Sequence, residues 1–161
     1  MRRLRVRGFA ARLGIACAIA FIGVFIIGLA GVSKAPSTPF DEAAHLDYLF
    51  KIADGHMPAV GEVYGQKILS IMACDNPRGA AWAGVEPCGS AHFDPARAPF
   101  SGESSATSNA PTYYVLSAIP FRLCTFATDL NPRTCGRAAN VVWLSAAAAA
   151  QETLAGSRNL R

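Results

Sequence analysis

A charge-free apolar run near the N-terminus constrains the fold of this chain more than any other feature. Leu13–Val32 holds 20 residues without a single Lys, Arg, Asp or Glu. As a helix that rises ~1.5 Å per residue, the run is roughly 30 Å long, which matches the hydrocarbon thickness of a bilayer. Backbone polar groups in lipid must bond within their own segment, so the run has to be helical. The sequence therefore predicts one strong N-terminal transmembrane helix.

The residues before this run predict its orientation. Residues 1–12 contain five arginines and no acidic residue, and such a cluster favours the cytoplasmic side. We therefore expect a plasma (inner) membrane protein with a cytoplasmic N-terminus and an extracytoplasmic loop over residues 33–136. A secretory signal cleaved after Ala30 is the main alternative, although its apolar region is usually only ~7–15 residues long. Arg2-Arg3 could also start a twin-arginine signal, and either signal would still export the rest of the chain.

The charge distribution argues against a nucleic-acid partner. Ten of the eleven acidic residues fall between Asp41 and Asp129, and the stretch from Lys34 to Arg137 carries eight Lys or Arg, so it is nearly neutral. A nucleic-acid binder concentrates basic charge on a folded face. Here the basic cluster adjoins the apolar run instead, which predicts membrane lipid as a partner and no nucleic acid.

Four cysteines lie in the predicted extracytoplasmic loop, where disulfides persist. They are Cys74, Cys88, Cys124 and Cys135, and four cysteines allow three pairings. The local pairing, Cys74 with Cys88 and Cys124 with Cys135, is the one we expect, with free thiols as an alternative. A zinc site would need cysteines two to four residues apart, and that spacing is absent.

The predicted loop region begins with a helix over about residues 39–54. Thr38 suits the N-cap, Pro39 suits the first helical position, and Gly55 suits the stop. The next ordered piece, Val60–Ala73, reads equally well as helix or strand. Residues 74–110 are rich in Pro, Gly and Ser and are expected to be loop.

Two later segments are apolar but less clear. Residues 111–123 are too short to span and contain Pro120, so we expect an interfacial helix with its tyrosines at head-group level. Residues 137–155 could form a weaker second transmembrane helix, followed by a cytoplasmic tail at 156–161. The predicted fold class is a mainly α membrane protein: one strong N-terminal transmembrane helix, a large extracytoplasmic loop with short helices, and this second span left open.

The residues best suited to chemistry lie at the start of the first loop helix. On a helix, Asp41 and His45 are i,i+4 neighbours, and Glu42 and His45 are i,i+3 neighbours. A carboxylate beside an imidazole can take a proton from a hydroxyl or contribute to a divalent metal site. The structural alternative is that the acids complement the helix dipole and the histidine pairs with them.

These residues belong to a longer pattern. Pro39-Phe40-Asp41-Glu42-Ala43-Ala44-His45 comes after the basic tail and first span, and Asn109-Ala110-Pro111-Thr112-Tyr113-Tyr114 precedes a short apolar helix. In this order they resemble the GT-C class of membrane glycosyltransferases, such as the protein O-mannosyltransferases and aminoarabinose transferases. That class has Pro-x-Asp-Glu-x-x-His after its first span and often His-Pro-Pro-x-Tyr-Tyr later. The histidine and first proline of the second element are not matched here.

The resemblance implies an activity and roles for particular residues. It implies inverting sugar transfer from a polyprenyl-phosphate donor on the outer face, with this chain as the N-terminal part of an enzyme that has further membrane spans. Asp41, and next Glu42, would be catalytic, with His45 as their neighbour and a divalent metal near all three as an option. Tyr113, Tyr114 and Arg137 would contact the lipid phosphate or the acceptor. The alternative function is a non-enzymatic, membrane-anchored protein with a disulfide-stabilised extracytoplasmic binding domain.

Overall fold

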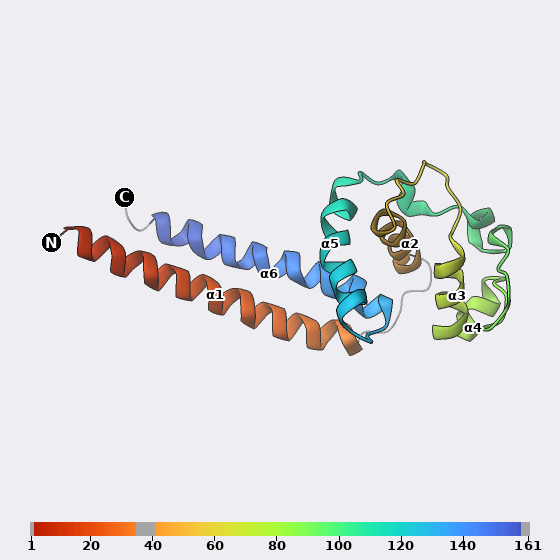
Figure 1. Cartoon of the computed structure of the whole chain (residues 1–161), viewed down its shortest axis with the longest axis horizontal. Coiled ribbons are helices and arrows are strands. Elements are labelled where there is room, and N and C mark those ends of the chain that lie inside the picture. Colours follow the sequence, from red (N-terminus) through yellow and green to blue (C-terminus); the bar gives the residue numbers. More distant parts are fainter. Residues whose placement is uncertain (1, 35–40, 159–161) are drawn as a thin grey trace. The chain divides into compact units, whose positions relative to one another are not determined.

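The chain divides into two compact units, seen in a computed structural model that describes residues 2–34 and 41–158 (Figure 1). Residues 36–136 form one unit, here called the globular unit. The second unit, here called the helical pair, combines the N-terminal segment with residues 137–161. The predicted helix start at Thr38 and Pro39 lies outside the described residues.

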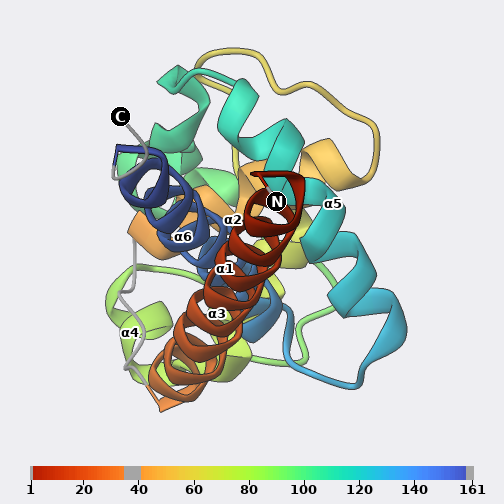
Figure 2. The same ribbon diagram turned by 90° about the vertical axis from the view of Figure 1, so that its left-hand side faces the viewer.

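The helical pair consists of α1 (Arg2–Lys34) and the greater part of α6 (Pro132–Arg158). The two helices lie side by side in both views (Figures 1 and 2). They approach closely at Gly28, where an added Cβ would stand 2.7 Å from Cγ1 of Val141. The guanidinium of Arg137 donates a hydrogen bond of 2.9 Å to the carbonyl of Val32. A small residue at the contact allows this approach.

Leu13–Val32 lies within α1 and is the one segment of the described residues that is long and apolar enough to cross a bilayer. Its mean hydropathy is 2.7. The predicted second span, residues 137–155, is helical within α6 but is not apolar enough to count as a second segment that could cross a bilayer. Alanine dominates this stretch of α6, and a methyl side chain buries little apolar surface.

The globular unit is mainly helical, and its described residues form no strand beyond an isolated bridge between Val63 and Glu103. Its longer elements are α2 (Asp41–Ala53), α3 (Gln66–Asp75), α4 (Pro77–Trp82) and α5 (Thr112–Ala127). Three short 3-10 helices, η1 (Pro95–Arg97), η2 (Pro99–Gly102) and η3 (Ser105–Ser108), come after α4. Residues 66–73 are therefore helix. The prediction that residues 74–110 are loop is wrong for Pro77–Trp82, which form α4. Asn76 caps this helix, because its side chain accepts a hydrogen bond from the Gly79 amide.

Helix α5 contains Pro120 and ends at Ala127, beyond its predicted end at residue 123. A proline inside a helix costs about 3 kcal/mol. Ser117 and Ala118 precede Pro120 and Phe121 comes directly after it, and all three are buried. Burial on both sides of the proline thus holds a helix that local propensity alone would end.

Helix α2 is the centre of the globular unit and lies between α5 and α3 (Figure 1). The ring of Tyr48 stacks on Tyr114 with centroids 3.9 Å apart, and Phe50 meets Phe121 edge-on at 5.1 Å. From α3, Ile68, Leu69 and Met72 are buried. Such aromatic pairs add about 0.5–1.5 kcal/mol beyond their buried area, so α2 and α5 form the main packing contact.

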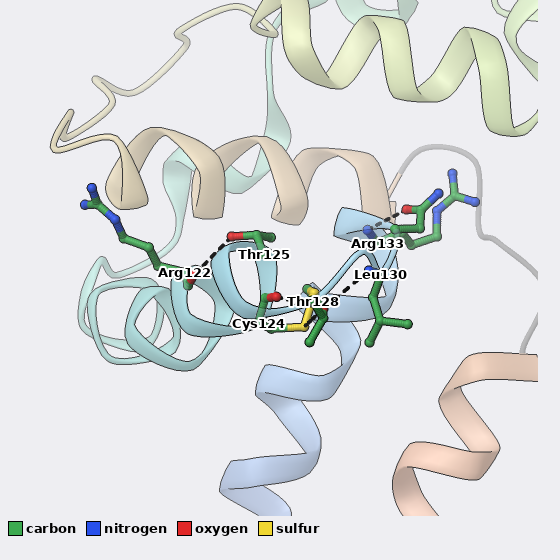
Figure 3. Close-up of a disulfide and its surroundings, with 8 residues drawn as sticks. Arg122, Cys124, Thr125, Thr128, Leu130 and Arg133 are labelled. Carbon is green, nitrogen blue, oxygen red and sulfur yellow. Dashed lines mark hydrogen bonds between the residues drawn. A yellow bond between two sulfur atoms is a disulfide. The ribbon is translucent and has the colours of Figure 1, made fainter.

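Two disulfides join elements of the globular unit. Cys74 of α3 is bonded to Cys88, and Cys124 of α5 is bonded to Cys135 in the first turn of α6, which is the local pairing expected from the sequence. Between the second pair the chain turns tightly, with the Thr128 hydroxyl donating to the Cys124 carbonyl at 2.8 Å (Figure 3). The remaining cysteine, Cys17, lies in α1 and forms no disulfide.

Removing the second disulfide should destabilise the globular unit. In the Cys124→Ser/Cys135→Ser double variant we expect the free energy of unfolding to fall by about 3 kcal/mol. This is the free-energy equivalent of the conformational entropy that the unfolded chain regains when a loop of this length is no longer closed. The measurement is denaturant unfolding of the full chain in detergent micelles, monitored by near-ultraviolet circular dichroism. Cys17→Ser is the control and should leave the curve unchanged. Coincident curves for the double variant and the unsubstituted chain would contradict the expectation.

Candidate functional site

The predicted acid–histidine pair is present on the first turns of α2. Nε2 of His45 lies 3.5 Å from Oδ1 of Asp41, the contact expected for i,i+4 neighbours. The Asp41 side chain is 83% exposed and that of His45 is 43% exposed. Asp41 therefore offers solvent a carboxylate at the N-terminal end of a helix, where the helix dipole stabilises negative charge.

Tyr114 connects this pair to α5, although it is distant in sequence. Its hydroxyl is hydrogen-bonded to Nδ1 of His45 and accepts a second hydrogen bond of 3.2 Å from the Asn109 side-chain amide. Its ring is stacked on Tyr48 and only 2% exposed. The Tyr114 ring is therefore not presented to lipid head groups, because it belongs to the core between α2 and α5; the depth of α5 relative to a membrane stays a prediction.

One assignment of hydrogens satisfies every partner along this line. Asn109 donates to the Tyr114 oxygen, the Tyr114 hydroxyl donates to Nδ1 of His45, and Nε2–H of His45 points at Asp41. Burial raises the pKa of Tyr114, and the hydrogen bond from Asn109 offsets only part of the rise. Tyr114 thus remains a hydroxyl donor at neutral pH, and the acceptor end of the line is the Asp41 carboxylate.

Glu42 turns away from this line. Its Oε2 lies 3.8 Å from Nε of Arg133 in the first turn of α6, and the same guanidinium lies 3.4 Å from Oδ2 of Asp75. The Asn131 amide also donates to Asp75 at 3.0 Å. Glu42 thus ties α2 to α3 and α6 within the globular unit, whereas Asp41 is the acid that is exposed to solvent.

The other residues expected near the site have different places. Tyr113 is 45% exposed and meets Tyr114 edge-on, with centroids 5.0 Å apart, so it lies at the surface beside the site. Arg137 belongs to the helical pair, where it bonds to the Val32 carbonyl. The structure therefore brings Tyr113 and Tyr114 to the Asp41–His45 pair within one unit.

A divalent metal near Asp41, Glu42 and His45 stays a prediction. The part of the chain that the structure describes has no group of three or more His, Cys, Asp or Glu side chains arranged to hold a metal. Asp41 and His45 together supply two donors of suitable chemistry, and Glu42 is committed to Arg133. A metal at this place would need its remaining ligands from another source.

A second polar cluster lies farther along α2 around Lys51, where the i,i+4 spacing of Asp47 and Lys51 already predicts one of its ion pairs. The ammonium of Lys51 stands 2.9 Å from Oδ2 of Asp47 and 2.9 Å from Oε1 of Glu62, and it donates to the Val63 carbonyl at 2.6 Å. The other Asp47 oxygen accepts from the Gly65 amide at 2.9 Å. The cluster fastens the segment after α2 back onto the helix, and Lys51 is therefore not available to a ligand.

Burial and ion pairing move the two carboxylates of this cluster in opposite directions. Burial raises the pKa of Asp47, although Lys51 and the Gly65 amide oppose the rise. At Glu62 the partial burial is outweighed by hydrogen bonds from Lys51, His56 and the Ala59 amide, which lower the pKa to about 2. The cluster is thus built around an ionised Glu62.

Asn109 and Arg133 are the site residues that sequence reasoning did not single out. Asn109 stands where the GT-C pattern has histidine, five residues before Tyr114, and it bonds to the same tyrosine hydroxyl. That mismatch was the only signal for it. Arg133 comes directly after the Asn131-Pro132 helix start, and no motif or spacing in the sequence predicted its ion pair with Glu42.

Replacing the largely shielded Lys51 ammonium, whose side chain is 13% exposed, should be costly. In Lys51→Met, Asp47 and Glu62 lose their shared cation, and a buried pair broken from one side costs about 3–5 kcal/mol. Chemical denaturation at pH 7 measures the loss. Lys67→Met makes the same chemical change at a side chain that is 59% exposed, and a surface pair is worth about 0–1 kcal/mol. Equal losses in the two variants would argue against the cluster.

The stability of the globular unit should depend on pH through Glu62. Its folded pKa of about 2 lies below the ordinary glutamate value of 4.5, so its stabilisation is complete above pH ~4.5 and is lost as the pH falls towards 2. Glu62→Gln removes this dependence, and the difference in unfolding free energy between the two chains should shrink as the pH falls. Asp47 has the opposite slope, which is smaller in the Glu62→Gln chain because the Glu62 charge is one cause of its raised pKa. A difference that does not change with pH would contradict the assignment.

Comparison of the chain with protein-family models, curated proteins and solved structures finds no match.

Proposed function

We propose that this chain supplies the first span and the acid-bearing extracytoplasmic unit of a GT-C-like membrane glycosyltransferase. One observation carries the proposal. The two sequence elements that resemble that class, one ending at His45 and one ending at Tyr114, meet in a single hydrogen-bonded line. They are 69 residues apart in sequence, so their contact is not a consequence of local spacing.

The proposed reaction moves a sugar from a polyprenyl phosphate to an acceptor hydroxyl. Asp41 takes the proton of the hydroxyl as the acceptor oxygen bonds to the anomeric carbon. The bond between that carbon and the phosphate oxygen breaks, and the lipid phosphate leaves with the electron pair. Attack from the side opposite the phosphate inverts the anomeric centre. His45, held by Tyr114, keeps the Asp41 carboxylate in place.

Stabilisation of the departing phosphate needs positive charge close to it. Lys51 is only 13% exposed and is shared by Asp47 and Glu62, so it cannot take this role. Arg137 lies in the helical pair, with its guanidinium bonded to Val32. We therefore propose that further membrane spans provide the cation and the donor site, as in the class that the motifs resemble.

The localisation is part of the same proposal. Leu13–Val32 anchors the chain in the plasma (inner) membrane, the arginine-rich tail stays in the cytoplasm, and the globular unit is extracytoplasmic. The two disulfides of the globular unit support this assignment, because disulfides persist in oxidising compartments.

A second candidate function is a membrane-anchored binding domain without catalytic activity. The globular unit favours it by having its own core around α2 and two disulfides. In that case Asp41 would be a helix-end acid whose removal changes helix stability alone. Sugar transfer by the Asp41 variant separates the two functions.

Substituting the exposed acid should abolish transfer without unfolding the unit. In Asp41→Asn we expect sugar transfer to fall at least ~100-fold, the lower range for loss of a general base. The full-length gene product is assayed in membranes with labelled polyprenyl-phosphate mannose, glucose and aminoarabinose as donors. Asp129→Asn makes the same change at an exposed carboxylate outside the site and should leave transfer intact. Undiminished transfer by Asp41→Asn, or no transfer from any donor by the unsubstituted protein, would overturn the proposal.

A further inference from the structure

Helix α5 has an exposed apolar face opposite the face it packs on α2. Leu116, Ile119, Leu123 and Phe126 recur every three or four residues, and the Phe126 side chain is 90% exposed. A hollow of about 360 Å³ lies along this face, bordered by Ile119, Arg122, Leu123 and Phe126. Three of these four side chains are apolar, and such a cluster on an exposed helix face calls for a hydrophobic partner.

A second hollow of about 380 Å³ adjoins the first and shares Arg122 and Phe126 with it. It has an aromatic floor and a cationic edge. Lys67 lies over the Phe50 ring, 4.7 Å from its centroid, and 3.5 Å from the Asp54 carboxylate. Arg122 is fixed at its edge because it donates a hydrogen bond of 2.8 Å to the Ala53 carbonyl at the end of α2.

The first hollow is mainly apolar. The second is bordered by two cations, Lys67 and Arg122, and by one carboxylate, Asp54. This division fits an amphiphile with an anionic head and a hydrocarbon tail. Each volume lies within the range of about 300–1,000 Å³ that is usual for small-ligand sites. A protein helix would cover the apolar half, whereas an anionic head group would also balance the one excess positive charge of Lys67, Arg122 and Asp54.

The tether of the globular unit favours the bilayer as the source of this amphiphile. The proposed span ends at Val32, and α2 begins at Asp41. Helix α1 continues to Lys34, and the seven residue steps from Lys34 to Asp41 can extend over roughly 25 Å at most. Under the anchoring proposed above, this short tether makes membrane lipid the amphiphile most available to the unit.

We propose that these joined hollows bind an anionic phospholipid of the surrounding bilayer. The phosphate lies between Lys67 and Arg122, and an acyl chain covers Ile119, Leu123 and Phe126. The proposal depends on the membrane anchoring stated above and not on sugar transfer.

The test uses the full chain in lipid nanodiscs with a local fluorescent reporter. Phe126→Trp is introduced together with Trp82→Phe and Trp143→Phe, so that emission comes from the α5 face alone. Nanodiscs contain phosphatidylcholine with a minor fraction of phosphatidylglycerol, and bromine is placed on the acyl chains of one lipid or the other. Quenching per brominated lipid should be about fivefold stronger for phosphatidylglycerol, the enrichment given by one basic residue at a lipid surface.

Matched variants locate the preference. Lys67→Gln should remove most of it, Lys67→Arg should keep it, and Arg78→Gln, the same charge loss on α4, should leave it intact. Near-ultraviolet circular dichroism verifies that each variant is folded. Equal quenching by both lipids, no quenching by either, or equal effects of Lys67→Gln and Arg78→Gln would overturn the site. Cancellation of the preference by a trace of undecaprenyl phosphate would overturn its assignment to bulk phospholipid.

A separate measurement distinguishes failure of this proposal from failure of the anchoring. Release of the chain from membranes by alkaline carbonate would contradict the anchoring, and the lipid site with it. Retention in the membrane together with equal quenching would overturn the lipid site alone and leave the anchoring in place.

Discussion

Aromatic packing between α2 and α5 is the interaction on which the rest of the globular unit depends. Tyr48 against Tyr114 and Phe50 against Phe121 hold the two helices together. The same contact fixes the hydroxyl of Tyr114 at His45, and through His45 it orients Asp41. Packing and candidate chemistry are thus not separable, since one buried tyrosine belongs to both.

Helix α2 carries carboxylates in two contrasting environments. Asp47 is buried and neutralised by Lys51, which makes it a fixed part of the framework. Asp41, less than two turns away, is open to solvent and contacts only His45 among the ion pairs of the described residues. The two acids thus differ in burial and not in residue type, and the exposed one is the acid to which we assign the proposed chemistry.

The parts of the structure that sequence could predict are those fixed by local composition. The apolar run in α1, the body of α2 and the tendency of cysteines to pair across short loops all depend on neighbouring residues. The helix over 111–123 was expected although it contains Pro120, but its extension to Ala127 was not, and burial of Ser117 and Phe121 outweighs the cost of the proline. The place of Tyr114 depends on partners from α2, and Arg133 joins Glu42 to Asp75 across three helices. Such tertiary contacts leave no periodic trace in a single sequence.

In the topology proposed above, the bond between Cys124 and Cys135 would link maturation of this protein to its passage across the membrane. Thiols remain reduced in the cytoplasm, so the bond that joins α5 to the start of α6 would close only after export of the segment. A copy retained inside would keep its apolar α5 face but lack this covalent bond, and its globular unit would be less stable for that reason.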